Sequence, residues 1–198
     1  MTKRAVDVVV AGTLLVLLAP VLAALALVIK LTSHGPVLHR TTRVGRHGVP
    51  FTLLKLRSMR VDEGKGPAIT ARGDARVTAV GRLIRRAKLD ELPQLWNVIS
   101  GDMSLVGPRP EDPRYVEWYD AAQRHLFDWR PGMTSPASVT YRDEERVLAA
   151  ALAAGRPLDD AYREVLAAKL AIELDYFPIA TVRSDLAWLW RTAAALVR

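Results

Sequence analysis

Two adjacent carboxylates, Asp90 and Glu91, lie in the segment LDELPQL of a strongly basic chain. The segment GDMSLVGPRP follows closely and places Arg109 between Pro108 and Pro110. A carboxylate attacks a phosphate poorly because both are anions, so the pair needs a metal ion or an arginine beside it. These residue types therefore indicate chemistry on a phosphate, with cations around the attacking carboxylate.

The composition favours an anionic partner and excludes thiol chemistry. The chain has 198 residues, enough for one domain with a core of its own. Its 28 Lys and Arg exceed 21 Asp and Glu, which suits nucleic acid, acidic lipid or a phosphorylated substrate, or simply a solvated basic surface. There is no cysteine, which excludes disulfides and thiolate metal sites. Because no nucleic-acid-binding motif is present, we expect no nucleic-acid partner.

An uncharged apolar run extends from Val8 to Ile29. As a helix it would measure about 33 Å, enough for a hydrocarbon core of roughly 30 Å. A cleaved signal peptide, a spanning helix and a re-entrant helix are the three interpretations. The run continues past the small residues that would mark a cleavage site, which speaks against the first.

Two features favour the re-entrant interpretation over the spanning one. Pro20 lies near the middle of the run, where it should kink the helix. Basic residues flank both ends, and the positive-inside rule then places both ends in the cytoplasm. These features favour a re-entrant membrane helix over 1–32, kinked at Pro20, before a cytoplasmic catalytic domain over 33–198, and a spanning helix stays open.

The remaining pattern predicts an α+β fold, with a mainly helical cytoplasmic domain, a small β-hairpin and interfacial amphipathic helices. Strands over 37–42 and 49–56 should be joined by a turn at 45–48, and the Gly-rich stretch 62–74 reads as a mobile loop. A helix should end near Lys88, and Pro93 then places Asp90 and Glu91 just before or within the first turn of the next helix. Such a turn favours bound anions.

Three helices are expected in the C-terminal half. The first covers 143–154 and ends at Gly155, and the second is capped by Asp159 or Asp160 and ends near 176. The last, capped by Thr181 or Ser184, carries an apolar face with two tryptophans, Trp188 and Trp190. That face would pack into the core or lie at the bilayer surface, and the tryptophans would suit a membrane contact or a homodimer equally well.

The order of motifs resembles a known family. A basic N-terminus and a Pro-broken apolar run precede Gly35-Pro36-Val37, KLRSM at 55–59, LDELPQL at 89–95, GDMSLVGPRP at 101–110 and RPGMT at 130–134. This order resembles the bacterial sugar transferases, the monotopic phosphoglycosyl transferases. The resemblance covers nearly the whole chain, from Lys3 to Ala195, and its two central motifs are too long for a chance match.

The resemblance implies a reaction and a location. A sugar-1-phosphate would pass from a UDP-sugar to a polyprenol phosphate such as undecaprenyl phosphate, with release of UMP. This is the first membrane step in the synthesis of surface polysaccharides and glycoconjugates. The family also implies a monotopic protein of the bacterial inner membrane, with a re-entrant helix, both ends cytoplasmic, and membrane lipids as further partners.

The resemblance also implies residue roles. Asp90 matches the family nucleophile, which forms a covalent phosphosugar intermediate, and Glu91 matches its dyad partner, the main candidate with Asp90 for holding Mg²⁺. Arg109, on the turn with Pro108 and Pro110, would clamp phosphate. Further phosphate-binding candidates are Lys55, Arg57 and Arg85, although Lys55 and Arg57 could instead form a solvated strand face.

The chain departs from the family pattern after RPGMT. Many members carry a stretch of the type Gly-Trp-Ala-Gln-Val there, whereas this chain reads SPASV at 135–139. The identity of the sugar therefore stays open, as does the role of 135–142. A membrane-anchored scaffold with a basic surface is the alternative from another class, and it predicts no UMP release.

Overall fold

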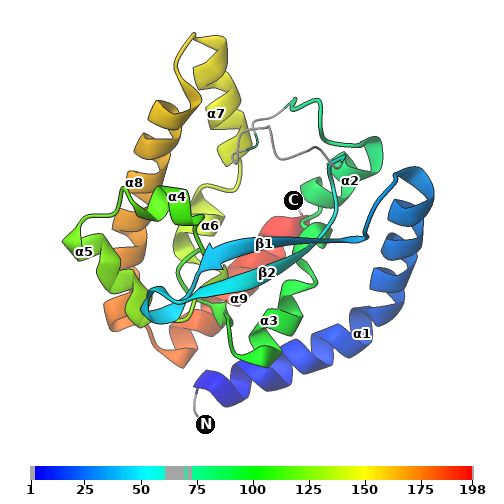
Figure 1. Cartoon of the computed structure of the whole chain (residues 1–198). Coiled ribbons are helices and arrows are strands. Elements are labelled where there is room, and N and C mark those ends of the chain that lie inside the picture. Colours follow the sequence, from blue (N-terminus) through cyan, green and yellow to red (C-terminus); the bar gives the residue numbers. More distant parts are fainter. Residues whose placement is uncertain (1–2, 61–69, 71–72, 198) are drawn as a thin grey trace.

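The computed structural model describes residues 3–60, 70 and 73–197 (Figure 1). The Gly-rich loop expected over 62–74 lies almost entirely outside these residues. The fold is helix-rich with two small sheets, as the α+β prediction required. Its elements follow in the order α1 (Lys3–Thr32), β1 (Leu38–Val44), η1 (Arg46–Gly48), β2 (Pro50–Leu56), α2 (Ala79–Arg86), η2 (Leu89–Glu91), α3 (Gln94–Ser100), β3 (Ser104–Val106), α4 (Pro113–Val116), α5 (Ala121–Arg124), η3 (His125–Asp128), β4 (Gly132–Thr134), α6 (Pro136–Thr140), α7 (Glu144–Ala153), α8 (Leu158–Tyr176), η4 (Phe177–Ile179) and α9 (Val182–Val197).

The apolar run forms the long helix α1, which contains Pro20. Among the described helices α1 alone is long and apolar enough to cross a membrane, and it leaves side chains such as Val16 and Leu17 largely exposed. In Figure 1 the helix lies along one side of the molecule and changes direction midway along its length. Exposed apolar surface on this scale is costly in water, so α1 indicates membrane association.

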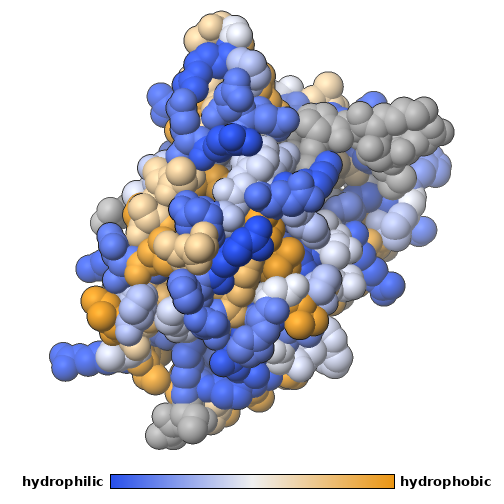
Figure 2. Space-filling model, turned by 60° about the vertical axis from the view of Figure 1, so that its left-hand side comes forward, coloured by the Kyte–Doolittle hydropathy of each residue, from blue (hydrophilic) through white to orange (hydrophobic). Residues whose placement is uncertain are grey.

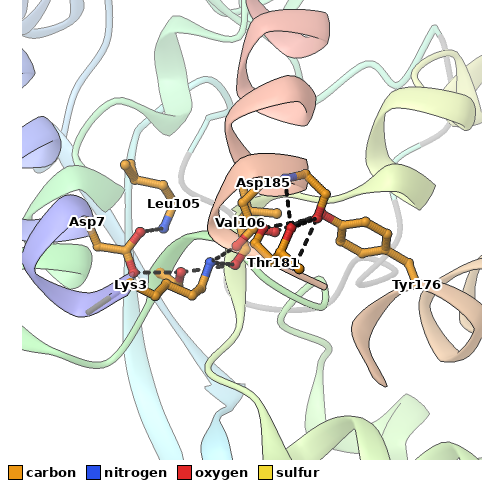
Figure 3. A network of polar contacts seen from close by, with 9 residues as sticks. Lys3, Asp7, Leu105, Val106, Tyr176, Thr181 and Asp185 are labelled. Atoms are coloured by element: carbon orange, nitrogen blue, oxygen red, sulfur yellow. Dashed lines mark hydrogen bonds and ion pairs between the residues drawn. The ribbon is translucent and has the colours of Figure 1, made fainter. Parts of the chain in front are cut away.

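Hydrogen bonds and an ion pair hold the first turns of α1 against the rest of the protein (Figure 3). Asp7 is buried and accepts from Ser104 Oγ at 2.8 Å and from the Leu105 N–H at 3.2 Å. Lys3 pairs with Asp185 of α9 and donates to the Val106 carbonyl at 2.9 Å. The start of the membrane helix is thereby joined to β3 and α9 at once.

The opposite end of α1 packs on the hairpin of β1 and β2. These strands are antiparallel, with His39 opposite Lys55, and they confirm the two strands and the turn expected from the sequence. Ile29 of α1, Leu56 of β2 and Ile84 of α2 form a buried cluster there. The strand that carries Lys55 therefore runs from the body of the domain to the end of the membrane helix.

A second sheet joins two segments far apart in the sequence. β3 and β4 pair in parallel, with Ser104 opposite Gly132 and Val106 opposite Thr134. Directly after β3 the backbone of Gly107 passes so close to Gly132 that a Cβ on Gly132 would lie 2.1 Å from the Gly107 nitrogen. Only glycine fits such an approach, and the pairing fixes the start of the turn that carries Arg109.

The C-terminal helices form the largest core, which surrounds α8 and includes Tyr115, Leu148, Leu166 and Phe177. The three expected helices are present as α7, α8 and α9. The predicted acidic cap of α8 is wrong: its N-cap is Pro157, and the two aspartates lie within the first turn, where they still face the helix dipole favourably.

The apolar face predicted for α9 is divided between core and solvent. Leu189 packs against the core, whereas Leu186 and Trp190 remain 49% and 76% exposed. The side of the molecule that carries α4, α5 and α8 has a more hydrophilic surface than α1. Figure 2 shows hydrophilic side chains over much of this side, with hydrophobic ones in small separate areas. That distribution suits contact with water.

Candidate functional site

A tight turn between α2 and α3 places the two adjacent carboxylates. Lys88 ends the α2 segment in the left-handed conformation, with φ of 56°, which is uncommon for a residue with a side chain. The 3-10 turn η2 follows and contains Asp90 and Glu91, and α3 begins after Pro93. Of the two positions predicted for the pair, just before the next helix or within its first turn, the structure confirms the first.

Asp90 is a buried carboxylate with a free oxygen. The residue is only 5% exposed, and its Oδ1 atom has no hydrogen-bond partner. Burial raises the pKa of Asp90 above its ordinary value; the charge of Lys55 opposes this shift and that of Glu91 adds to it. The result is a poorly solvated and more basic carboxylate.

Glu91 lies between two cations from different parts of the chain. Lys55 Nζ of β2 is 3.4 Å from Glu91 Oε1, and Arg109 Nη2 is 4.0 Å from the same oxygen. Burial would raise the pKa of Glu91, but the charges of Lys55 and Arg109 outweigh it and hold the pKa at about 2. Glu91 is therefore ionised at neutral pH, and the two cations converge on its Oε1 atom.

Burial and the neighbouring charges also shift the pKa values of Lys55 and Arg109. Burial lowers the pKa of Lys55, and the charge of Glu91 opposes this change. Burial would also lower the pKa of Arg109, but the negative charges of Glu91 and Glu144 keep it above its ordinary value. Arg109 thus stays charged at the edge of the dyad, as a phosphate ligand must.

Two further predicted phosphate ligands have partners away from the dyad. Arg57 is buried, and its Nη2 donates to the carbonyl and Oγ of Ser33, just beyond α1, at 2.7 and 2.8 Å. Its Nε and Nη1 atoms are buried without hydrogen-bond partners. Arg85 of α2 pairs with Glu145 of α7. The structure therefore brings Lys55 and Arg109 to Glu91 and keeps Arg85 close enough for its charge to oppose the rise in the pKa of Asp90. It holds Arg57 at the end of α1.

The turn that carries Arg109 has a contact that the sequence reading missed. Glu173 of α8 accepts from the Arg109 N–H at 3.1 Å and from Ser135 Oγ at 2.8 Å, both on its Oε1 atom. Burial raises the pKa of Glu173 to about 7, against the effect of those two hydrogen bonds. A single glutamate in a long helix carries no motif, so no signal in the sequence singled it out.

The dyad offers the number of carboxylates that a magnesium ion takes when it binds together with a substrate. No group of three or more His, Asp or Glu that could hold a metal occurs in the part of the chain that the structure describes. Mg²⁺, however, usually takes one or two carboxylates and completes its shell with water and substrate phosphates. Asp90, with its unpartnered Oδ1, and Glu91 supply that number.

Comparisons with known proteins agree on one family. A family model described as bacterial sugar transferase matches residues 1–198. The chain is 42% identical over 199 residues to the UDP-glucose:undecaprenyl-phosphate glucose-1-phosphate transferase of Caulobacter vibrioides, covering 98% of this chain and 69% of that protein. It is 48% identical over 155 residues to the enzyme of the same name from Escherichia coli, covering 74% of this chain and 32% of the relative.

A third relative differs in its sugar. The UDP-N-acetylgalactosamine-undecaprenyl-phosphate N-acetylgalactosaminephosphotransferase of Aeromonas hydrophila is 41% identical over 145 residues, which cover 70% of this chain and 34% of that protein. The chain thus spans about a third of the length of the E. coli and Aeromonas relatives.

The raised pKa of Glu173 predicts how the stability of the protein depends on pH. Below its ordinary value of 4.5 the carboxyl is protonated in both the folded and the unfolded chain, and its contribution to stability is fully present. That contribution is lost as the pH rises toward 7, because the unfolded chain ionises first. Glu173→Gln cannot ionise, so its advantage over the parent protein should grow from pH 4.5 to pH 8, up to roughly 3 kcal/mol.

Thermal unfolding in detergent at several pH values measures this difference. Asp175→Asn, an exposed position two residues further along α8, is the matched control and should show no such trend. A Glu173→Gln difference that stays constant from pH 4.5 to pH 8 would contradict the assignment.

Proposed function

We propose a reaction for this chain from one premise: it belongs to the bacterial sugar transferase family, whose model covers residues 1–198. The reaction moves a sugar-1-phosphate from a UDP-sugar to undecaprenyl phosphate in the membrane and releases UMP. The product starts a surface polysaccharide or glycoconjugate. The observation that carries the proposal is the buried Asp90 beside Glu91, with Lys55 and Arg109 converging on the pair.

The site suits a nucleoside diphosphate because its cations come from separate, fixed elements. Lys55 projects from β2 and Arg109 from the turn after β3, so a diphosphate between them would meet positive charge from two directions. Pro108 and Pro110 restrict the backbone on either side of Arg109, which limits the freedom that substrate binding must remove. Arg85 can add to this charge if the donor displaces Glu145.

The chemistry divides into two displacements at the same phosphorus. In the first, an Asp90 oxygen bonds to the phosphorus that carries the sugar, and the bond to the bridging oxygen breaks, so UMP leaves with that oxygen. In the second, an oxygen of undecaprenyl phosphate bonds to this phosphorus, and the bond to Asp90 breaks. Both nucleophiles react as anions and need no base, and the charges of Lys55 and Arg109 offset theirs.

Magnesium is the cofactor we propose for this site. Glu91 would hold it, with Asp90 as the second carboxylate, and it would neutralise charge on the donor diphosphate. The dyad already meets two cationic side chains. Those side chains stabilise Glu91 as the anion that a hard cation requires.

A re-entrant path for α1 suits the second substrate, which is confined to the membrane. Pro20 lies within α1, and Arg57 fixes the residue just after the helix to the strand that carries Lys55. The bonds of Lys3 and Asp7 fasten the other end to β3 and α9, which supports a retained helix rather than a cleaved leader. Basic residues flank both ends of the helix, so the domain to which they are fastened is proposed to face the cytoplasm of a bacterial inner membrane.

Asp90→Asn tests the nucleophile. The amide cannot attack phosphorus, so UMP release from a UDP-sugar should fall by roughly a thousandfold or more. The measurement is UMP release with undecaprenyl phosphate and a panel of UDP-sugars, which also names the donor sugar. Asp175→Asn makes the same chemical change at an exposed position and should behave as the parent does.

Substantial turnover by purified Asp90→Asn would overturn the nucleophile. A parent protein that releases no UMP from any UDP-sugar would instead favour the membrane-anchored scaffold.

Removal of divalent metal tests the cofactor. Excess EDTA should lower UMP release by roughly a hundredfold, and added Mg²⁺ should restore it. Glu91→Gln should raise the Mg²⁺ concentration needed for half-maximal activity, because it removes one of the two carboxylates. Undiminished activity in EDTA would reject the magnesium proposal.

Single cysteines test the path of α1, since the chain has none of its own. Thr2→Cys and His34→Cys mark the two ends of the helix, and His34 is exposed. A membrane-impermeant thiol reagent should reach both from the cytoplasmic face of inverted vesicles and neither from the outside of intact cells. Labelling from opposite faces would mean a spanning helix.

A further inference from the structure

Glu173 is a buried acid in α8. The residue is 2% exposed, and the cations that act on it, Lys169 and Arg109, oppose the rise of its pKa less than its two hydrogen bonds do. Lys169, one helical turn earlier, is committed to Glu144 at 2.8 Å. A buried carboxylate costs free energy that an apolar side chain would avoid. The contribution of Glu173 to the structure therefore lies in the hydrogen bonds that it accepts.

Both of those hydrogen bonds converge on one oxygen. The Arg109 N–H donates to Glu173 Oε1 at 3.1 Å, and Ser135 Oγ donates to the same atom at 2.8 Å. Ser135 is the N-cap of α6, and its Oγ also accepts from the Ser138 N–H at 3.0 Å. Glu173 therefore links the Arg109 turn and the start of α6 to the buried side of α8.

The turn of Pro108, Arg109 and Pro110 makes the first of these bonds unusually important. Proline has no N–H, so the Arg109 N–H is the only backbone donor of these three residues. On one side the turn is held by the Gly132 N–H, which donates to the Pro108 carbonyl at 2.8 Å. Glu173 is the group that holds the Arg109 backbone itself, and from there the side chain extends to Glu91.

We propose that Glu173 is a positioning residue for the transferase reaction, holding the Arg109 backbone so that the guanidinium meets the donor diphosphate beside Glu91. This rests on the proposed function. Glu173 touches no reacting atom and acts through Arg109. The raised pKa of Glu173 agrees with a carboxyl placed for this contact at the expense of its solvation.

A purely structural role would link α6 to α8 through Ser135 and leave Arg109 unaffected. A double-mutant cycle separates the two roles, because residues that act as a unit are not additive. The changes are Glu173→Met, which fills similar space but offers only a weakly accepting sulfur, Arg109→Ala, and both together. Ser135→Ala removes the α6 contact alone, and Asp175→Asn is the exposed control on the same helix.

The measurement is kcat/KM for UMP release with the best UDP-sugar of the panel. Glu173→Met should lower it roughly 10- to 100-fold, chiefly through KM for the UDP-sugar, and should lower it less than about twofold further in the Arg109→Ala background. Glu173→Gln should recover most of the loss, because its amide oxygen can accept the same bonds. Ser135→Ala should cost much less than Glu173→Met.

Equal losses in the two backgrounds, or a Ser135→Ala loss as large as that of Glu173→Met, would overturn the proposal. If Glu173→Met does not fold, Glu173→Asp takes its place in the cycle: it keeps the charge but withdraws the oxygen by one methylene, and the same non-additivity is expected. An inactive parent protein would count against the proposed reaction itself. Additive losses in an active parent would count only against the role of Glu173.

Discussion

The convergence of Lys55 and Arg109 on Glu91 is the interaction on which the rest of the site depends. Two neighbouring carboxylates in a poorly solvated turn would repel each other and tend to take up protons. The two cations, 3.4 and 4.0 Å from one Glu91 oxygen, keep Glu91 ionised. They also supply the positive field without which a carboxylate and a diphosphate would repel each other.

The residues of this site come from segments that lie far apart in the sequence. Lys55 comes from the hairpin, the dyad from the turn between α2 and α3, and Arg109 from a turn fixed by the β3–β4 pairing. The first turns of α1 are joined to β3 through Asp7, and its far end is joined to Arg57 through the residue that follows it. The membrane helix and the site are thus parts of one packed unit, which suits a lipid substrate.

The sequence allowed much of this to be predicted, but only where chemistry leaves a local pattern. Alternating residues and a glycine-rich turn predicted the hairpin, and Pro93 placed Asp90 and Glu91 before α3. The partners of Arg57 and Arg85 were not predictable, because Ser33 and Glu145 are distant in sequence and chemically ordinary. The contact of Glu173 with the Arg109 backbone was not predictable for the same reason. It is one hydrogen bond across the fold, and the neighbours of Glu173 in the chain do not indicate it.

The most direct test follows the phosphorus atom that is proposed to bond to Asp90. A UDP-sugar labelled with ³²P at the phosphorus that carries the sugar is incubated with the protein alone, and undecaprenyl phosphate is added afterwards. Label should appear on the protein together with free UMP, and the lipid should then remove it from the protein in a single step. Label that reaches the lipid only when both substrates are present, without ever being bound to the protein, would contradict the covalent mechanism.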